Sequence, residues 1–122
     1  MRRLGNKFFA KKFIAPNGQK FDSRAEYGRW LELKALEERG AITGLRRQVE
    51  FELLPKQLTP EGKTLERAAN YTADFTYRDN ESGAMVAEDT KSKYTRGEPD
   101  YILRRKMFRF FHREWEFREV IR

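Results

Sequence analysis

One capped helix followed directly by β-forming segments leaves few folds open to this chain. Ser23 is a typical N-cap, and Glu26 three residues later completes the pattern of a capping box. Apolar residues then recur at helical spacing up to Gly40, which is a typical helix stop. Residues 48–53 alternate strictly between polar and apolar side chains, which predicts a strand.

Further β-forming and helical segments complete the predicted order. Residues 71–77, rich in aromatic and β-branched side chains, predict a second strand, and a polar turn separates it from a third at 85–91. The stretch 55–67 is polar and contains Pro and Gly, so we predict a loop there. An arginine-rich amphipathic helix is predicted at 101–113 and a last strand at 115–121. The order helix, three strands, helix, strand predicts an α/β fold in which helices flank a mixed β-sheet.

The length of 122 residues suits one domain with one core. We assign residues 23–122 to this domain. Residues 1–22 are predicted to form a basic N-terminal arm and a hairpin, which runs from Phe13 to Phe21 and turns at residues 16–18.

Positive charge is concentrated at the two ends of the chain. The net charge is +7, with seven basic residues against one acid in residues 1–24 and seven against three in residues 101–122. The middle of the chain carries twelve basic and fifteen acidic residues. The basic ends predict a polyanionic partner such as DNA. Acids would only weaken a simple charge-neutralising contact, so their abundance indicates that some of them hold metal ions against the nucleic acid.

Several classes of protein are excluded by what the sequence lacks. It has no cysteine and one histidine, which excludes a disulfide framework and argues against zinc, whose ligands are chiefly nitrogen and sulfur. No apolar run approaches the ~20 residues of a membrane span. The basic N-terminus is not followed by the apolar core of a signal peptide. We therefore expect a cytoplasmic protein with no membrane partner.

The segment Asp89-Thr90-Lys91 carries the first candidate site residues. On a strand, residues two apart point to the same face, roughly 6.5–7 Å apart. The Asp89 carboxylate could therefore hold a divalent metal while the Lys91 ammonium acts near the attacking water or the scissile phosphate. The same acid-x-Lys pattern at 32–34 and 61–63 falls in a helix and in a loop, so position separates the third occurrence from chance.

Asp74 lies within the second predicted strand, one hairpin away from Asp89. Strands are poor in Asp, and aromatic residues surround Asp74, so a purely structural role fits poorly. If the two strands pair, the carboxylates lie close together and repel each other unless a cation lies between them. Carboxylate oxygens suit Mg²⁺ or Mn²⁺, which we predict as the cofactor.

The arrangement of Glu26 on a helix, then Asp74, then Asp89-Thr90-Lys91 resembles the PD-(D/E)XK nuclease superfamily. The likeness is greatest to small phage-encoded members, in the branch of Holliday junction resolvases and transposition endonucleases. It covers most of residues 20–121 and is carried by FDSRAEYGRWLELKALEERGAITGLRRQVEFELLP, YTADF and VAEDTKSK. The resemblance implies a restriction-endonuclease-like core.

The resemblance also implies one catalytic cluster, made of Glu26, Asp74, Asp89 and Lys91. The implied metal ligands are Glu26, Asp74, Asp89 and, as a candidate through its carbonyl, Thr90. Lys91 would position or polarise the nucleophile. Gln48 matches a glutamine that is common in this branch and is a candidate accessory residue. Ala73 stands where the name-giving motif has Pro, at a position that varies widely in the superfamily.

Other interpretations of these residues stay open. Glu26 could serve only the helix cap, and Asp74 could be a solvated strand residue. Asp89 could form a plain surface ion pair with Lys91. Glu88 could be the metal ligand instead, although on a strand it would face away from the lysine.

Contacts to the nucleic-acid backbone are predicted for basic side chains of the arm, the segment before the first strand, the segment after the third strand and the second helix, because guanidinium forks match phosphate geometry. These residues are Arg2, Arg3, Lys7, Lys11, Lys12, Arg46, Arg47, Lys93, Arg104, Arg105 and Lys106. Such contacts make binding salt-dependent and mostly independent of base sequence.

From these features and the resemblance we expect a metal-dependent endonuclease that hydrolyses DNA phosphodiester bonds. The resemblance adds a branched or junction substrate, in recombination or packaging of a phage genome, and hence a phage-encoded or prophage protein in a bacterial host. Cutting two strands in concert would require a homodimer. The alternatives are a non-catalytic DNA-binding or architectural protein and a nuclease directed at RNA.

Overall fold

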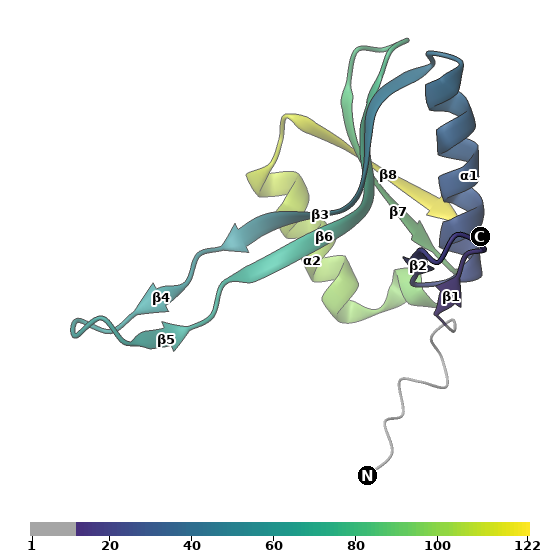
Figure 1. The fold of residues 1–122 in the computed structure, drawn as a ribbon. Coiled ribbons are helices and arrows are strands. Elements are labelled where there is room, and N and C mark those ends of the chain that lie inside the picture. Colours follow the sequence, from purple (N-terminus) through teal and green to yellow (C-terminus); the bar gives the residue numbers. More distant parts are fainter. Residues whose placement is uncertain (1–11) are drawn as a thin grey trace.

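A computed structural model gives the structure of the protein and describes residues 12–122. Two helices flank a four-stranded sheet whose order is β3 (Ile42–Leu54), β6 (Ala69–Asp79), β7 (Met85–Lys91) and β8 (Trp115–Ile121) (Figure 1). The first three strands are antiparallel, and β8 runs parallel to β7 because helix α2 (Pro99–Phe111) connects them. The prediction of an α/β fold with a mixed sheet is confirmed.

Helix α1 (Arg24–Glu38) begins where the sequence predicts. Ser23 is the N-cap, and its hydroxyl accepts from the backbone N–H of Glu26 at 3.0 Å. Gly40 follows the helix with a φ of 81°, a conformation that glycine adopts without strain. The predicted capping box is only half formed, because the Glu26 carboxylate accepts from the N–H of Asp22 at 3.1 Å rather than from that of Ser23. This contact joins Glu26 to the segment before the helix.

The two helices cover opposite faces of the sheet. Leu33 of α1 packs in one core cluster with Val86, whereas Phe108 of α2 packs in the other with Phe51 and Ala87. Val86 and Ala87 are neighbours on β7 and must point to opposite faces. The core therefore has two layers, one on each side of the sheet, as expected for a sheet that helices cover on both sides.

The alternation predicted for 48–53 holds, because Val49, Phe51 and Leu53 all pack in the α2 cluster, but it does not extend to the start of strand β3. Leu45 packs against the α1 cluster, whereas Val49 packs against the α2 cluster, although regular alternation would place both on one face. Between them Gln48 has a φ of 51°, which interrupts the regular strand. The paired strand β6 changes face at the same level, since Ala73 lies in the α2 cluster and Phe75 in the α1 cluster.

The sheet opens into two branches just beyond this level. Pairing of β6 with β7 runs from Arg78 opposite Met85 to Phe75 opposite Glu88. From there β6 continues with β3, while β7 continues with β8, and the two pairs diverge (Figure 1). We call the place where they separate the notch; Asp74 lies in it, directly before Phe75.

The prediction of a loop over 55–67 is wrong in part. Strands β4 (Gln57–Leu58) and β5 (Thr64–Glu66) pair there and form a narrow arm that extends away from the rest of the molecule (Figure 1). Pairing of β3 with β6 continues to Leu54 and Ala69 and brings the two ends of this stretch together. The polar composition of the β4–β5 arm lacks the apolar alternation that predicts strands, so the sequence indicated a loop. The predicted helix at 101–113 also begins two residues earlier, because Pro99 suits the first turn of α2.

The predicted hairpin is formed by β1 (Phe13–Ile14) and β2 (Lys20–Phe21), and it packs on α1. Phe21 is buried, with its ring 5.1 Å from that of Tyr27 and 6.2 Å from that of Trp30. These contacts fix the chain at the residue before Asp22. Residues 1–11 of the basic arm, including Lys11, lie outside the described residues, whereas Lys12 is described.

Candidate metal centre

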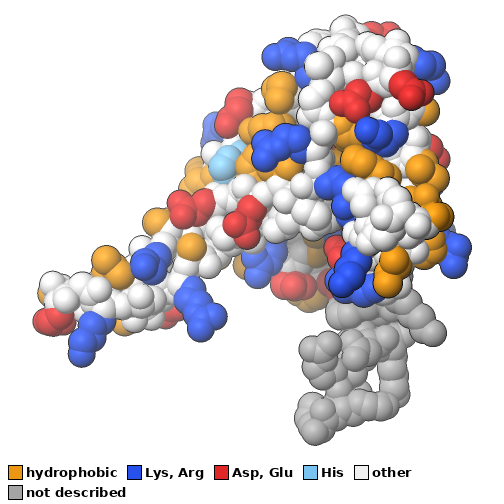
Figure 2. Space-filling view, viewed as in Figure 1, with side chains coloured by type: hydrophobic (Ala, Val, Ile, Leu, Met, Phe, Trp, Pro, Cys, Tyr) orange, Lys and Arg blue, Asp and Glu red, His pale blue; other side chains and the backbone are white. Residues whose placement is uncertain are grey.

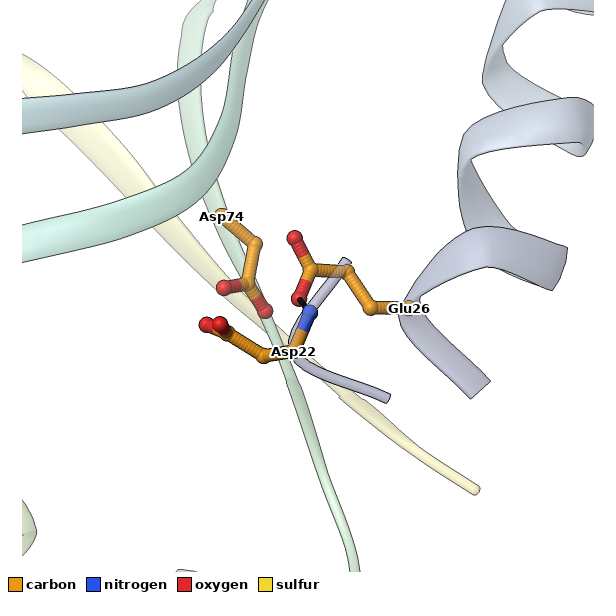
Figure 3. Close-up of side chains that lie close together, drawn as sticks. All are labelled: Asp22, Glu26 and Asp74. Carbon is orange, nitrogen blue, oxygen red and sulfur yellow. Dashed lines mark hydrogen bonds between the residues drawn. The ribbon is translucent and has the colours of Figure 1, made fainter. Parts of the chain in front are cut away.

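Three carboxylates from separate segments meet at the notch. Asp22 comes from the segment before α1, Glu26 from the first turn of α1, and Asp74 from β6, and they point toward one another (Figure 3). One oxygen from each lies within 4.8 Å of the others. Asp22 was not predicted as a site residue. The sequence signal that could have found it is its position one residue before the N-cap.

Glu26 is held in place by hydrogen bonds to both of its oxygens. Oε1 accepts from the Asp22 N–H, and Oε2 accepts from Nε2 of Gln48 at 2.9 Å. Glu26 is 2% exposed although it lies in the first turn of a helix. The residue that interrupts the regular strand β3 is thus also the one whose side chain contacts Glu26.

Asp74 spans the notch between the two branches of the sheet. Its Oδ2 accepts from the backbone N–H of Thr90 at 2.8 Å, beyond the last backbone pairing of β6 with β7. The Asp74 carboxylate thereby accepts a backbone hydrogen bond of β7 that a residue of β6 would accept if the two strands were still paired. Thr90 meets Asp74 through this N–H, whereas the resemblance assigns its carbonyl to the metal.

Asp89 and Lys91 lie on the same face of β7 and form an ion pair, with Nζ 3.0 Å from Oδ2. Asp89 is 2% exposed, and the Lys91 side chain is 24% exposed. Burial alone would lower the pKa of Lys91, but the charge and hydrogen bond of Asp89 outweigh it, and the pKa is raised. The ammonium therefore stays charged and can act as a donor but not as a base.

The pKa values of three buried acids are raised, chiefly by burial. Burial, then the charges of Asp89 and Glu26, raise the pKa of Asp74 to about 9. Burial and then the charge of Asp22 raise the pKa of Glu26. Burial also raises the pKa of Asp89, although Lys91 opposes this. So much negative charge in a buried place calls for a cation.

The donor set fits a hard divalent cation. Every side chain of the cluster offers carboxylate oxygen, which suits Mg²⁺ or Mn²⁺ and not a metal that prefers nitrogen or sulfur. Within the described residues a cation of the protein itself already contacts the cluster, since Lys12 Nζ lies 2.8 Å from Asp22 Oδ1. We conclude that the residues present could hold such a metal.

A hollow of about 380 Å³ adjoins Asp89 and Lys91. Tyr71 of β6 and residues of α2, among them Tyr101 and Arg104, also line it. Tyr71 is 4% exposed, and its hydroxyl has no hydrogen-bond partner among residues 12–122. Burial, then the charge of Asp89, raise the pKa of Tyr71, so this hydroxyl is a neutral donor beside the acids.

Comparison with known proteins identifies the family. Residues 5–122 match the family model described as "Protein of unknown function (DUF1064)". The chain belongs to the DUF1064 family. No curated protein and no solved structure matched it. The matched segment contains every residue of the cluster described above.

Glu88 of this DUF1064 chain lies on the other face of β7 from Asp89. It is fully buried, and its carboxylate accepts from Arg29 Nε at 2.5 Å and from the Tyr77 hydroxyl at 2.5 Å. These partners on the α1 side already compensate its charge. The structure therefore gives no support to Glu88 as an alternative metal ligand.

Replacing Arg29 with Ala is expected to lower the free energy of unfolding by about 2 kcal/mol, because the Glu88 charge would remain buried without its cation. Arg29 is 20% exposed, so water reduces the loss below the roughly 3–5 kcal/mol of a fully buried pair. Adding Glu88→Gln should restore most of the stability. Urea denaturation measures all three proteins, and equal stability of Arg29→Ala and wild type would contradict the prediction.

The predicted nucleic-acid-binding residues of this family member differ in their surroundings. Arg2, Arg3, Lys7 and Lys11 lie outside the described residues. Arg47 lies 3.8 Å above the Phe21 ring and donates to the Lys20 carbonyl, so it has a role within the fold. Arg105 is half-buried and lies 3.7 Å from Glu119. Arg104 is exposed at the hollow, where it also donates to the Asn70 carbonyl. The remaining exposed residues are Lys12, Arg46, Lys93 and Lys106.

No helix within residues 12–122 is long and apolar enough to cross a membrane.

Proposed function

We propose that this protein is a metal-dependent endonuclease that hydrolyses DNA phosphodiester bonds, with a restriction-endonuclease-like core of the PD-(D/E)XK type. One observation supports the proposal above all others. Glu26 and Asp74 lie with Asp22 in one group of carboxylates where β6 separates from β7. Asp89 lies beside Asp74 and pairs with Lys91, so residues distant in the sequence adjoin one another. A stable sheet gains nothing from buried acids whose pKa values are raised by burial and, for Asp74 and Glu26, by a neighbouring acid.

Each residue of the cluster has a distinct role in this proposal. Asp74 and Asp89 would hold the cation, with Glu26 and the newly found Asp22 completing the acidic side. A bound divalent cation would supply Lewis acidity toward the phosphate and a water of lowered pKa. Lys91 would donate to the attacking water or to the scissile phosphate, because its ammonium keeps its charge beside Asp89. Gln48 would keep the Glu26 carboxylate oriented.

Contacts with the DNA backbone would come from several parts of the surface. Lys and Arg side chains are spread over the visible face and along the β4–β5 arm, with acidic side chains between them (Figure 2). Such a distribution suits contact with an extended phosphate backbone more than with one compact anion. Arg104 would lie nearest to the cut, since it lines the hollow beside Lys91.

The biological setting is proposed from the resemblance alone. It comprises a branched or junction DNA substrate, a place in phage recombination or packaging, and a phage-encoded or prophage protein acting in the cytoplasm of a bacterial host. A homodimer would allow two strands to be cut in concert.

Purified protein is expected to nick plasmid DNA and to cut a synthetic four-way junction in Mg²⁺ or Mn²⁺, and to do neither in EDTA. Binding without cleavage in both metals would identify the rival function, a non-catalytic DNA-binding or architectural protein. Cleavage of RNA but not DNA would move the same site to another substrate. In every case binding should weaken steeply with added salt if phosphate contacts dominate.

A further inference from the structure

We propose that Tyr101 is the positioning residue that holds the Lys91 ammonium in the site. This inference rests on the proposed function, in which Lys91 acts on the substrate. Lys91 Nζ lies 4.7 Å from the centroid of the Tyr101 ring and 3.0 Å from Asp89 Oδ2. The ammonium is thus held by two groups of different kinds, a carboxylate on its own strand and an aromatic face on α2.

Asp89 by itself is a poor anchor for this lysine. It is also a proposed metal ligand, and a carboxylate that shares its charge with a divalent cation attracts an ammonium less strongly. The lysine side chain is long and flexible, so a weakened ion pair would leave Nζ free to move. An aromatic ring attracts an ammonium through the negative charge of its face and does not compete for the metal. Tyr101 can therefore keep Lys91 in place while Asp89 serves the cation.

The Tyr101 ring is itself firmly fixed. It is 8% exposed, and its hydroxyl donates to Glu119 Oε2 at 2.5 Å. Glu119 lies opposite Asp89 in the parallel register of β7 and β8, and it contacts Arg96 at 3.0 Å and Arg105 at 3.7 Å. An O–H that donates to a carboxylate leaves more negative charge on its ring, which strengthens the attraction for an ammonium.

The position of the pair also matches the proposed reaction. Tyr101 and Lys91 both line the hollow of about 380 Å³, together with Asp89 and Arg104. The ring therefore holds the ammonium at the wall of the space that a phosphate group would enter. Arg105 lies farther from the same ring, at 5.6 Å, and is turned to Glu119, so Lys91 is the nearer cation.

The test compares a variant that keeps the ring with one that removes it. Tyr101→Phe keeps the aromatic face and should retain kcat within about threefold, whereas Tyr101→Leu should lower kcat by about tenfold or more with little change in KM. Phe110→Leu removes an exposed ring near the other end of α2 and should leave cleavage unchanged. The proposal is overturned if Tyr101→Leu cuts like wild type or if Tyr101→Phe falls as far as Tyr101→Leu.

A second measurement does not depend on activity. The ring current of Tyr101 should shift the Lys91 Hε proton resonances upfield in wild type and in Tyr101→Phe, and this shift should be absent in Tyr101→Leu. Lys91 protons at the position of a freely exposed lysine in wild type would overturn the proposal, even if Tyr101→Leu does not fold. If wild type cuts no nucleic acid, the proposed function fails, and these shifts still decide whether Tyr101 holds Lys91.

Discussion

Replacing Asp89 with Asn, or Lys91 with Ala, is expected to lower metal-dependent DNA cleavage by about 10³-fold or more. In the proposed site Asp89→Asn removes a charged ligand of the cation, and Lys91→Ala removes the only ammonium that contacts Asp89 within residues 12–122. Both side chains face a hollow rather than the core clusters, so the fold and the other phosphate contacts should persist. DNA binding should therefore change by less than about threefold. Single-turnover cleavage and a binding titration at matched ionic strength separate the two effects.

Matched controls keep this test specific. Lys34→Ala removes an exposed lysine of α1, and Glu81→Gln removes an exposed acid in the turn before β7, so both change net charge as the site variants do. Neither should affect cleavage. If Asp89→Asn and Lys91→Ala both cut as fast as wild type, the cluster is not catalytic. A loss of binding as large as the loss of cleavage would assign these residues to DNA contact instead.

The second large effect concerns Asp74 and the stability of the metal-free protein. Its pKa in the folded protein is about 9, well above the ordinary value of 3.8. A carboxyl with a raised pKa stabilises the fold fully below its ordinary pKa, and this contribution is lost as the pH rises toward the folded pKa. Without metal, wild type should therefore lose stability relative to Asp74→Asn between about pH 4 and pH 9. Asn can still accept from the Thr90 N–H.

Divalent metal should make wild type more stable than Asp74→Asn, the reverse of the order expected without metal. At a concentration of about 100 times its Kd, a cation that binds only the folded protein adds about 2.7 kcal/mol to wild-type stability. The Asp74→Asn variant should gain much less, because it lacks one of the proposed charged ligands. Thermal denaturation at pH 8 with Mn²⁺ and with EDTA measures both proteins.

Asp79→Asn serves as a control, because the pKa of Asp79 is shifted in the opposite direction from that of Asp74. The hydrogen bond from Arg118 lowers the pKa of Asp79, so this carboxylate favours the fold above its ordinary pKa. The variant should be less stable than wild type at neutral pH and should respond to metal as wild type does. If Mn²⁺ stabilised wild type and Asp74→Asn equally, Asp74 would not be a ligand.

Much of the local structure could be predicted because its causes are local. Ser23 starts α1 through a hydrogen bond to a residue only three positions away in the sequence. Strands β7 and β8 have the predicted bounds because their residues suit strands. The shared face of Asp89 and Lys91 follows from the two-residue period of a strand. The same period explains why Glu88, the competing ligand, lies on the opposite face and meets Arg29.

The sequence alone determined the order of the two helices and of the four strands of the main sheet, the mixed character of that sheet and the shared face of an acid and a lysine on one strand. Only the tertiary structure brought Asp22 to Glu26 and Asp74, because hairpin packing on α1 sets the position of Asp22. Only the tertiary structure placed Asp74 across the notch, since that depends on where pairing between β6 and β7 ends. Both features arise from contacts between segments far apart in the chain, which no local pattern of residues encodes.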